Sequence, residues 1–165
     1  MVLITVLTPT GTLGYGFGTE ALDRGMRLKP DVIAVDAGST DPGPHYLGSG
    51  EPLVSRFSMK RELSDLIRAS RKAKIPLVVG SAGGSGCRRH VDWTVEIVRE
   101  VAREQGLAFK LAWIYADVVP QRVKDAIAQD EVRDFEAGFA LTEGMIDETV
   151  ALVAQMGHEP IAAAL

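Results

Sequence analysis

The sequence predicts an α/β fold, with a mainly parallel sheet of at least four strands and helices on both of its faces in a Rossmann-like, three-layer arrangement. Two observations predict it. Four short runs rich in Val, Ile and Leu lack a polar alternate face, which is typical of strands in a sheet that is covered on both sides. Amphipathic segments of helical period separate these runs, and strict alternation of strand and helix implies right-handed crossovers between parallel strands.

The elements follow one another in the order that such a fold requires. Strands are expected at residues 2–7, 31–35, 76–80 and 109–115. Helices are expected where apolar residues recur three or four positions apart, at residues 19–28, 58–73 and 91–105, and again at 142–157. The expected caps are Ser58 and Thr142 at helix N-termini and Gly106 and Gly157 at C-termini, and Lys29 with Pro30 should end the first helix.

Length, charge and cysteine content limit the classes of protein. A chain of 165 residues falls in the range of a single domain. Its net charge of -4 argues against partners such as nucleic acid or an anionic membrane, which need concentrated positive charge. The apolar run at residues 1–7 is far shorter than the ~20 residues of a membrane span and lacks the features of a secretory signal, so we expect a cytoplasmic protein. The single cysteine, Cys87, excludes a disulfide framework and a multi-cysteine zinc site.

Three polar, glycine-containing loops follow the first three expected strands. They occupy residues 8–18, 36–44 and 80–92. Loops at the carboxyl ends of parallel strands build the ligand crevice of an open sheet, so we expect these three loops to share one rim. Pro42 and Pro44 stiffen the second loop, which reduces the freedom that it would lose on binding a ligand.

Each of the first two loops has a functional and a structural interpretation. Gly11 and Gly14 can present backbone N–H groups to a phosphate or another anion, or they can serve turn geometry alone. The spacing fits neither the dinucleotide motif nor the P-loop. Asp36 stands where a dinucleotide fold places its ribose-binding acid, or it is a structural cap.

The third loop gives the sharper signal. Its sequence GSAGGSG lets the backbone approach an anionic ligand closely, with Ser81 and Ser85 as further donors beside Gly83 and Gly84. His90 and Asp92 follow at the expected helix start, as an acid or base and a dipole-favoured carboxylate, or only as a cap residue and a first-turn acid. A hard divalent metal ion is a further candidate ligand, through an oxygen-rich group drawn from Asp36, Asp41, His45, His90 and Asp92.

Several motifs together resemble one family. They are LTPTGTLGYGF, KPDVIAVDAGSTDPGP, YLGSG, GSAGGSG followed by HVDWTVEIVREVAREQGL, and VAQMGHEPIAAAL. In this order they are similar to the N-terminal part of the acyclic terpene utilization (AtuA-like) family. The resemblance implies that residues 1–165 are one α/β domain of a longer protein, whose sheet continues beyond Leu165. An open sheet edge and an exposed apolar tail at 161–165 are then expected.

The resemblance also implies a function. It suggests a catabolic enzyme, of the lyase or hydro-lyase type, that acts on a hydroxylated carboxylic acid or its CoA thioester. The expected partners are that small molecule, the remainder of a longer chain or a small partner subunit, and further copies of the same chain. A nucleotide-binding module and a non-catalytic interaction domain of a larger assembly remain as alternatives.

The candidate site residues combine the loops with the resemblance. The catalytic candidates, which would move a proton beside the bound oxygen, are Asp36, Asp41 and His90. The candidates for holding the substrate are Gly11, Gly14, Gly38, Ser39, Thr40, Gly43, Ser81, Gly83, Gly84 and Asp92.

Overall fold

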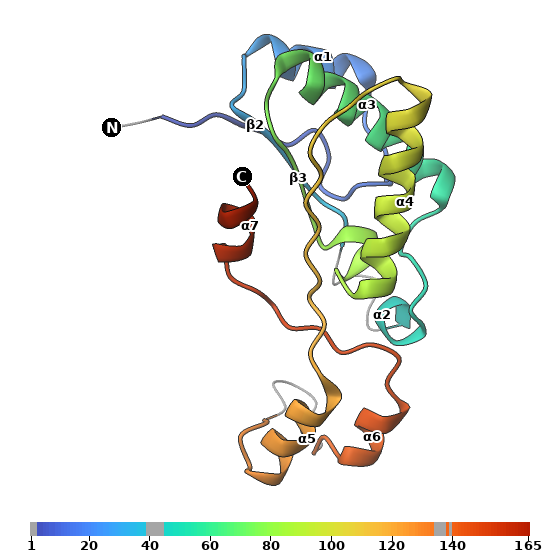
Figure 1. The fold of residues 1–165 in the computed structure, drawn as a ribbon, viewed down its shortest axis with the longest axis vertical. Coiled ribbons are helices and arrows are strands. Elements are labelled where there is room, and N and C mark those ends of the chain that lie inside the picture. Colours follow the sequence, from blue (N-terminus) through green and yellow to red (C-terminus); the bar gives the residue numbers. More distant parts are fainter. Residues whose placement is uncertain (1–2, 39–44, 134–137, 139) are drawn as a thin grey trace.

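The computed structural model describes residues 3–38, 45–133, 138 and 140–165, and it contains a small parallel sheet with helices (Figure 1). The strands are β1 (Val6–Leu7), β2 (Val32–Asp36) and β3 (Leu77–Gly80). The helices are α1 (Thr19–Arg27), α2 (His45–Ser49), α3 (Arg56–Ala73), α4 (Arg88–Glu104), α5 (Pro120–Ala128), α6 (Glu143–Glu148) and α7 (Glu159–Ala164), and a 3-10 turn lies at Ala82–Gly84. None of the helices in these described stretches is long and apolar enough to cross a membrane.

The sheet is parallel, as predicted, but it has three strands in the described residues rather than four or more. Its order is β1-β2-β3, with Val6 beside Val32 and Asp36 beside Gly80. Because the order steps in one direction, right-handed crossovers place their helices on one face. Ile33 and Val35 of β2 are accordingly buried, whereas the alternate residues are only partly buried. The Rossmann-like arrangement with helices on both faces is therefore not confirmed.

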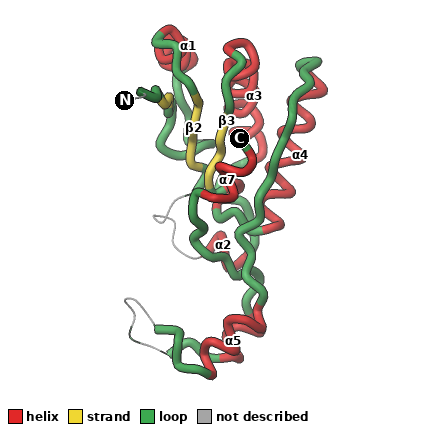
Figure 2. The backbone as a smooth tube through the Cα atoms, turned by 60° about the vertical axis from the view of Figure 1, so that its left-hand side comes forward, coloured by secondary structure: helices red, strands yellow, loops and turns green. Residues whose placement is uncertain are grey.

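The strand predicted at residues 109–115 is absent from the described sheet, and Figure 2 draws this segment as a loop. Its apolar side chains pack against helices instead. Phe109 and Leu111 lie against the core, and the guanidinium groups of Arg71 and Arg99 lie over the rings of Phe109 and Trp113 at 5.8 and 5.4 Å. Apolar composition predicted a strand here, but the segment is only partly buried and forms no strand pairing among the described residues.

The helix predicted at residues 142–157 is also shorter than expected. Thr142 is its N-cap, as predicted, and accepts a hydrogen bond from the Met145 N–H. The helix ends at Glu148, because the following backbone pairs with another segment. The Val118 N–H donates to Leu152 O at 2.9 Å and the Ala154 N–H donates to Ala116 O at 3.0 Å. The prediction of Gly157 as the C-cap is therefore wrong.

The other predicted helices form within a few residues of the expected bounds. The N-cap of α3 is Ser55 rather than Ser58, and its hydroxyl accepts the Ser58 N–H at 3.1 Å. The helix α1 ends at Arg27, before Lys29 and Pro30, as predicted. Gly106 has a left-handed φ of 62° just after α4, which fits its predicted place at that helix end.

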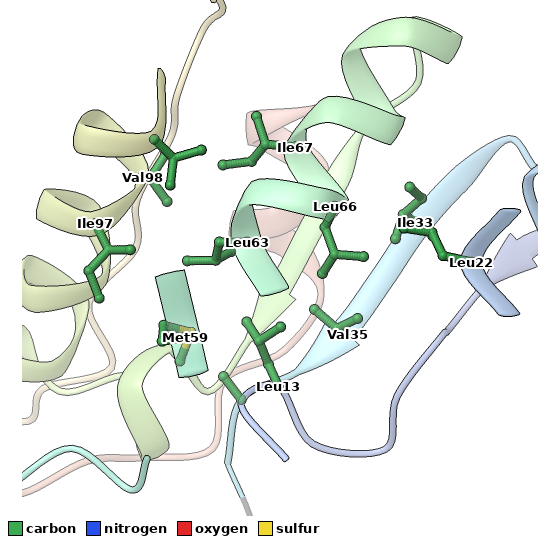
Figure 3. Packing of buried hydrophobic residues seen from close by; sticks show 12 residues of the cluster. Leu13, Leu22, Ile33, Val35, Met59, Leu63, Leu66, Ile67, Ile97 and Val98 are labelled. Carbon is green, nitrogen blue, oxygen red and sulfur yellow. The ribbon is translucent and has the colours of Figure 1, made fainter. Parts of the chain in front are cut away.

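The core lies on both sides of α3 (Figure 3). The buried residues of α3 recur at helical spacing, and in Figure 3 they lie between the side chains of β2 and those of α4. They are Met59, Leu63, Leu66 and Ile67, opposite Ile33 and Val35 of β2 and Ile97 and Val98 of α4. At the solvent edge of the α3–α4 contact, Glu100 accepts hydrogen bonds from Lys60 and Arg56. These bonds, with the larger effect from Lys60, lower the pKa of Glu100 to about 2.

Two helices form an arm that projects from this body. Figure 1 shows α5 and α6 at the end of a stalk, away from the sheet. The stalk consists of residues 116–118 and 152–154, which pair through the antiparallel bridge between Asp117 and Val153. Only Ile146 of the arm is buried in the described residues, so the arm has a small core of its own.

A buried carboxylate fixes the first glycine loop to α3. Glu62 is 2 % exposed and accepts the Gly14 N–H through Oε2 at 2.7 Å. Its other oxygen lies 3.4 Å from the Arg61 guanidinium. Only glycine fits at position 14 without a shift, because its φ is 100° and a Cβ there would lie 2.5 Å from Val54 Cγ2. This bond therefore sets the position of the loop at 8–18.

We expect Glu62→Ala to lower the free energy of unfolding by about 1.5–3 kcal/mol, since it removes a charged hydrogen bond and leaves the Gly14 N–H unpaired. Urea denaturation measures the change. Glu96→Ala, at an exposed position of α4, is the control and should stay within about 0.5 kcal/mol of the parent. Equal effects of the two substitutions would contradict the anchoring role.

Candidate functional site

The loops after β2 and β3 meet, as predicted from their places in the sheet. Gly38 is buried against the turn at 81–84. A Cβ at Gly38 would lie 2.6 Å from Gly84 O and 2.7 Å from Ser81 Cβ, so only glycine fits without a shift. We call Asp36, Gly38, Ser81 and Gly84 the loop junction. It brings residues from two predicted loops into one place.

Asp36 stands at the carboxyl end of β2, exposed to solvent. Its Oδ1 accepts the Gly38 N–H at 3.0 Å, and its backbone O accepts the Leu13 N–H at 2.7 Å. The same Oδ1 lies 3.8 Å from the Cβ position of Gly80 on β3. One carboxylate oxygen therefore holds the turn, and the other has no hydrogen-bond partner among the described residues. The carboxylate therefore caps the turn on a residue that is exposed to solvent.

The glycine turn after β3 is folded onto itself. Ser81 takes a left-handed conformation with a φ of 47°, and Gly83 and Gly84 have φ values of 74° and 127°. The Gly84 N–H donates to Ser81 O at 2.8 Å, and the Gly86 N–H donates to Ala82 O at 3.2 Å. These amides are occupied, so the predicted anion binding by the Gly84 N–H is not supported. The residue Ser81 is exposed to solvent.

His90 lies beneath this turn rather than at the surface. Its side chain is fully buried, and a Cβ on Gly83 would lie 2.7 Å from His90 Cβ. The Ser85 hydroxyl lies 2.8 Å from His90 Nδ1, and the Cys87 N–H donates to Ser85 Oγ at 3.3 Å. Burial places His90 out of direct reach of a ligand. Its contact with Ser85 Oγ connects it to the turn.

A third segment closes over the imidazole of His90. The Leu53 N–H donates to Gly83 O at 3.1 Å, and Leu53 Cβ lies 3.2 Å from the Cβ position of Gly84. The backbone of Glu51 and Gly50 lies near the ring and favours its protonation, although His90 Nε2 has no hydrogen bond of standard geometry in the described structure. Desolvation outweighs these groups and lowers the pKa of His90 below 6.5, with a smaller contribution from Arg89. The ring is therefore held neutral.

The structure separates Asp92 from the loop junction. Residues two positions apart on a helix point in nearly opposite directions, so Asp92 faces away from His90. Asp92 accepts a hydrogen bond from the Tyr115 hydroxyl at 2.7 Å, which raises the pKa of Tyr115. The Arg88 guanidinium lies 4.0 Å from the centre of the Tyr115 ring. These contacts are structural, and they do not support substrate binding by Asp92.

The first loop also departs from its functional interpretation. The Gly14 N–H is bonded to Glu62 and cannot bind an anion in this conformation. Gly11 is exposed, with no atom within 4 Å of its Cβ position, and it is not one of the four residues of the loop junction. The nucleotide-binding alternative rested on this loop and on the position of Asp36, and the bonded Gly14 N–H removes part of that support.

Four predicted site residues lie outside the described part of the chain: Ser39, Thr40, Asp41 and Gly43. The remaining residues test the metal site only in part. No group of three His, Cys, Asp or Glu side chains that could hold a metal ion occurs among the described residues. His45 is exposed on α2, where its ring packs edge-on against Tyr46 at 5.3 Å.

Ser85 was expected only as a donor of the third loop, and Arg89 was not among the predicted site residues. Ser85 links the turn to His90, and Arg89 pairs with Glu51 at 3.5 Å beside the segment that covers the imidazole. Arg89 is the cation beside this segment and is largely exposed, so it can attract a carboxylate. The signal was present in the sequence, because both residues lie in the GSAGGSGCRRH stretch.

The comparison with known families gives one match. A family model described as "Acyclic terpene utilisation family protein AtuA" matches residues 56–165. The matched range contains the glycine turn and α4, whereas Asp36 and Gly38 precede it. The resemblance in the sequence was traced over nearly the whole chain, which is further than the matched range. No significant match was found among curated proteins or solved structures.

Gly38→Ala tests the contact at the loop junction. We expect a loss of about 1–3 kcal/mol in the free energy of unfolding, because the new Cβ meets the backbone of Gly84 and the two loops must separate. Amide exchange should quicken in the turn at 81–86. Gly48→Ala is the control, since no atom lies within 4 Å of its Cβ position. If Gly38→Ala were as stable as Gly48→Ala, the described contact would be wrong.

The buried imidazole of His90 predicts a pH dependence of stability. Its folded-state pKa is lowered, so the unfolded chain binds the proton more readily. The stability that comes from the neutral ring is present above pH 6.5 and is lost as the pH falls through the folded-state pKa. His90→Gln should flatten this acid-side decline in urea midpoints. His45→Gln, at an exposed histidine, should keep the parental slope, and equal slopes for all three proteins would refute the assignment.

Proposed function

We propose that this chain, which belongs to the acyclic terpene utilisation family AtuA, acts on a branched hydroxy acid or its CoA thioester at the loop junction. Membership of the family supports a role in terpene utilisation. The lyase or hydro-lyase chemistry is our proposal. The observation that carries it is the contact of Gly38 with Ser81 and Gly84, which brings the loops that carry the exposed residues Asp36 and Ser81 together.

Acyclic terpenes yield branched carboxylic acids when they are degraded, so the proposed substrate carries a carboxylate or thioester carbonyl and a hydroxyl. The Ser81 hydroxyl can donate to one of its oxygens, and the Arg89 guanidinium offers a counter-charge to a free carboxylate. The Ser85 hydroxyl is held by His90 and by the Cys87 N–H. These groups would orient the substrate.

Asp36 is the proposed proton carrier. Its carboxylate would take the proton from the carbon next to the carbonyl, and the electron pair of that C–H bond would form the carbon–carbon double bond. The C–O bond to the hydroxyl on the next carbon would break, and this hydroxyl would leave as water with the proton returned from Asp36. The carboxylate of Asp36 is ionised again at the end of the reaction, so no other reactant is needed. His90 contributes by fixing the orientation of Ser85.

Asp36→Asn tests this role. The amide oxygen can still accept the Gly38 N–H, so the turn should keep its shape. We expect turnover to fall by about 10²–10⁴-fold, as for loss of a general base, while substrate binding changes little. Branched 3-hydroxy acids and their CoA thioesters are the probes, with loss of water followed by mass spectrometry and binding by calorimetry. Asp23→Asn, exposed on α1, is the control.

The outcomes are separable. Undiminished turnover of Asp36→Asn would contradict the proton-transfer role but leave the binding site standing. Absence of binding by every acid and thioester, with the parent folded, would contradict the substrate class.

A further inference from the structure

The Ser85 hydroxyl and the His90 imidazole form a polar pair at the glycine turn. Ser85 Oγ lies 2.8 Å from His90 Nδ1 and accepts the Cys87 N–H at 3.3 Å. A hydroxyl has one hydrogen to donate besides the bonds that it accepts. Within the described part of the chain, Nδ1 is the one acceptor in reach of that hydrogen. The Ser85 hydroxyl therefore donates to the imidazole.

The surroundings of His90 favour the tautomer that accepts this hydrogen. A neutral imidazole carries its proton on one nitrogen, and the other nitrogen is an acceptor. Burial keeps the ring neutral by lowering its pKa, although the backbone of Glu51 and Gly50 favours protonation. Because Nδ1 faces Ser85, these backbone groups support a proton on Nε2. The pair then has the polarity of a nucleophile and its base.

The place of Ser85 in the turn suits a reaction with a ligand. Ser85 is half-buried, and Ser81 and Arg88 on either side of it are exposed to solvent. It stands two residues before α4, a helix of 17 residues whose positive dipole end stabilises negative charge on nearby oxygens. His90 is held in place by full burial beneath Gly83. The hydroxyl thus stands between a fixed base and the solvent-facing part of the turn.

We propose that Ser85 is the nucleophile of a thioester hydrolysis, with His90 as its general base. Ser85 Oγ attacks the carbonyl carbon and passes its proton to His90 Nδ1. The C–S bond breaks and the departing sulfur takes that proton, so a thiol leaves and the acyl group stays on Ser85 as an ester. Water then attacks this ester, gives a proton through Nδ1 to Ser85 Oγ, and the free acid is released.

The strength of the base selects this class of substrate. Burial lowers the pKa of His90, so the imidazole is a weaker base than usual. A thiolate is a better leaving group than an amine, since a thiol is far more acidic, and it needs less help from the base. Thioesters therefore fit this pair better than peptides do. The hydrolysis goes beyond the dehydration proposed for Asp36, and it needs no hydroxyl on the substrate.

Covalent labelling tests the nucleophile. Diisopropyl fluorophosphate, from which an activated serine displaces fluoride, should label the chain at Ser85, and peptide mass spectrometry locates the label. Ser85→Ala should lose it. Ser64→Ala is the matched control and should label like the parent, because Ser64 is also half-buried and its hydroxyl donates to Lys60 O at 2.7 Å.

Hydrolysis of a small thioester tests the reaction. S-acetyl-N-acetylcysteamine carries no hydroxyl and cannot lose water, so the result is independent of the test of Asp36. We expect Ser85→Ala to reduce thiol release to the rate in buffer. His90→Asn keeps an oxygen that can accept the Ser85 hydroxyl but removes the base, so labelling and hydrolysis should both fall by about 10²-fold or more.

The urea midpoint of each variant shows whether it is folded. The proposal is overturned if Ser85 of the folded parent takes no label, or if Ser85→Ala releases thiol as fast as the parent. Labelling that is unchanged in folded His90→Asn would overturn the role of His90 as the base. If His90→Asn does not fold, the label on the parent and the comparison of Ser85→Ala with Ser64→Ala decide.

Discussion

The buried imidazole of His90 is the contact on which the loops at the carboxyl edge of the sheet depend. It belongs to α4, binds Ser85 of the glycine turn through Nδ1, and lies under the backbone of Gly83. The segment at 50–53 closes over it. Three stretches that are distant in the sequence thus share one polar group in an apolar setting. A neutral ring can hold them together, whereas a charged ring would have to be hydrated.

This arrangement divides the polar groups of the site into two layers. Asp36 and Ser81 are exposed to solvent, and His90 and Ser85 lie beneath or beside them and fix the turn. Gly38 joins the layers because it lets the backbone after β2 reach the turn after β3. Exposed chemistry on a rigid support is what a binding site needs, since a preorganised site loses less entropy when the ligand arrives.

The parts of the fold that depend on local sequence pattern could be predicted. The apolar runs at 31–35 and 76–80 form β2 and β3, and helical periodicity located α1, α3 and α4. Convergence of the loops at Gly38 and Ser81 followed from parallel strand order. Pairing depends instead on distant backbone, so nothing local showed that residues 109–115 would pack on helices or that residues 152–154 would pair with 116–118.

The candidate site was anticipated less well, and for a related reason. Residue type indicated that His90 and Asp92 could carry out chemistry, but burial decides how each is used. One turn of α4 places His90 inside and Asp92 outside, where Tyr115 binds it. Gly14 likewise looked like an anion donor until the buried carboxylate of Glu62, 48 positions away, took its N–H. Only the folded chain brings such pairs together.

The stalk of the α5–α6 arm ends at the glycine turn. Ala116 accepts the Ala154 N–H from the other side of the stalk, and its own N–H donates to Gly86 O at 2.9 Å. Ala116 thus joins the arm to the glycine turn through two backbone hydrogen bonds. A displacement of the arm that moved Ala116 would therefore strain the hydrogen bond at the last glycine of the turn.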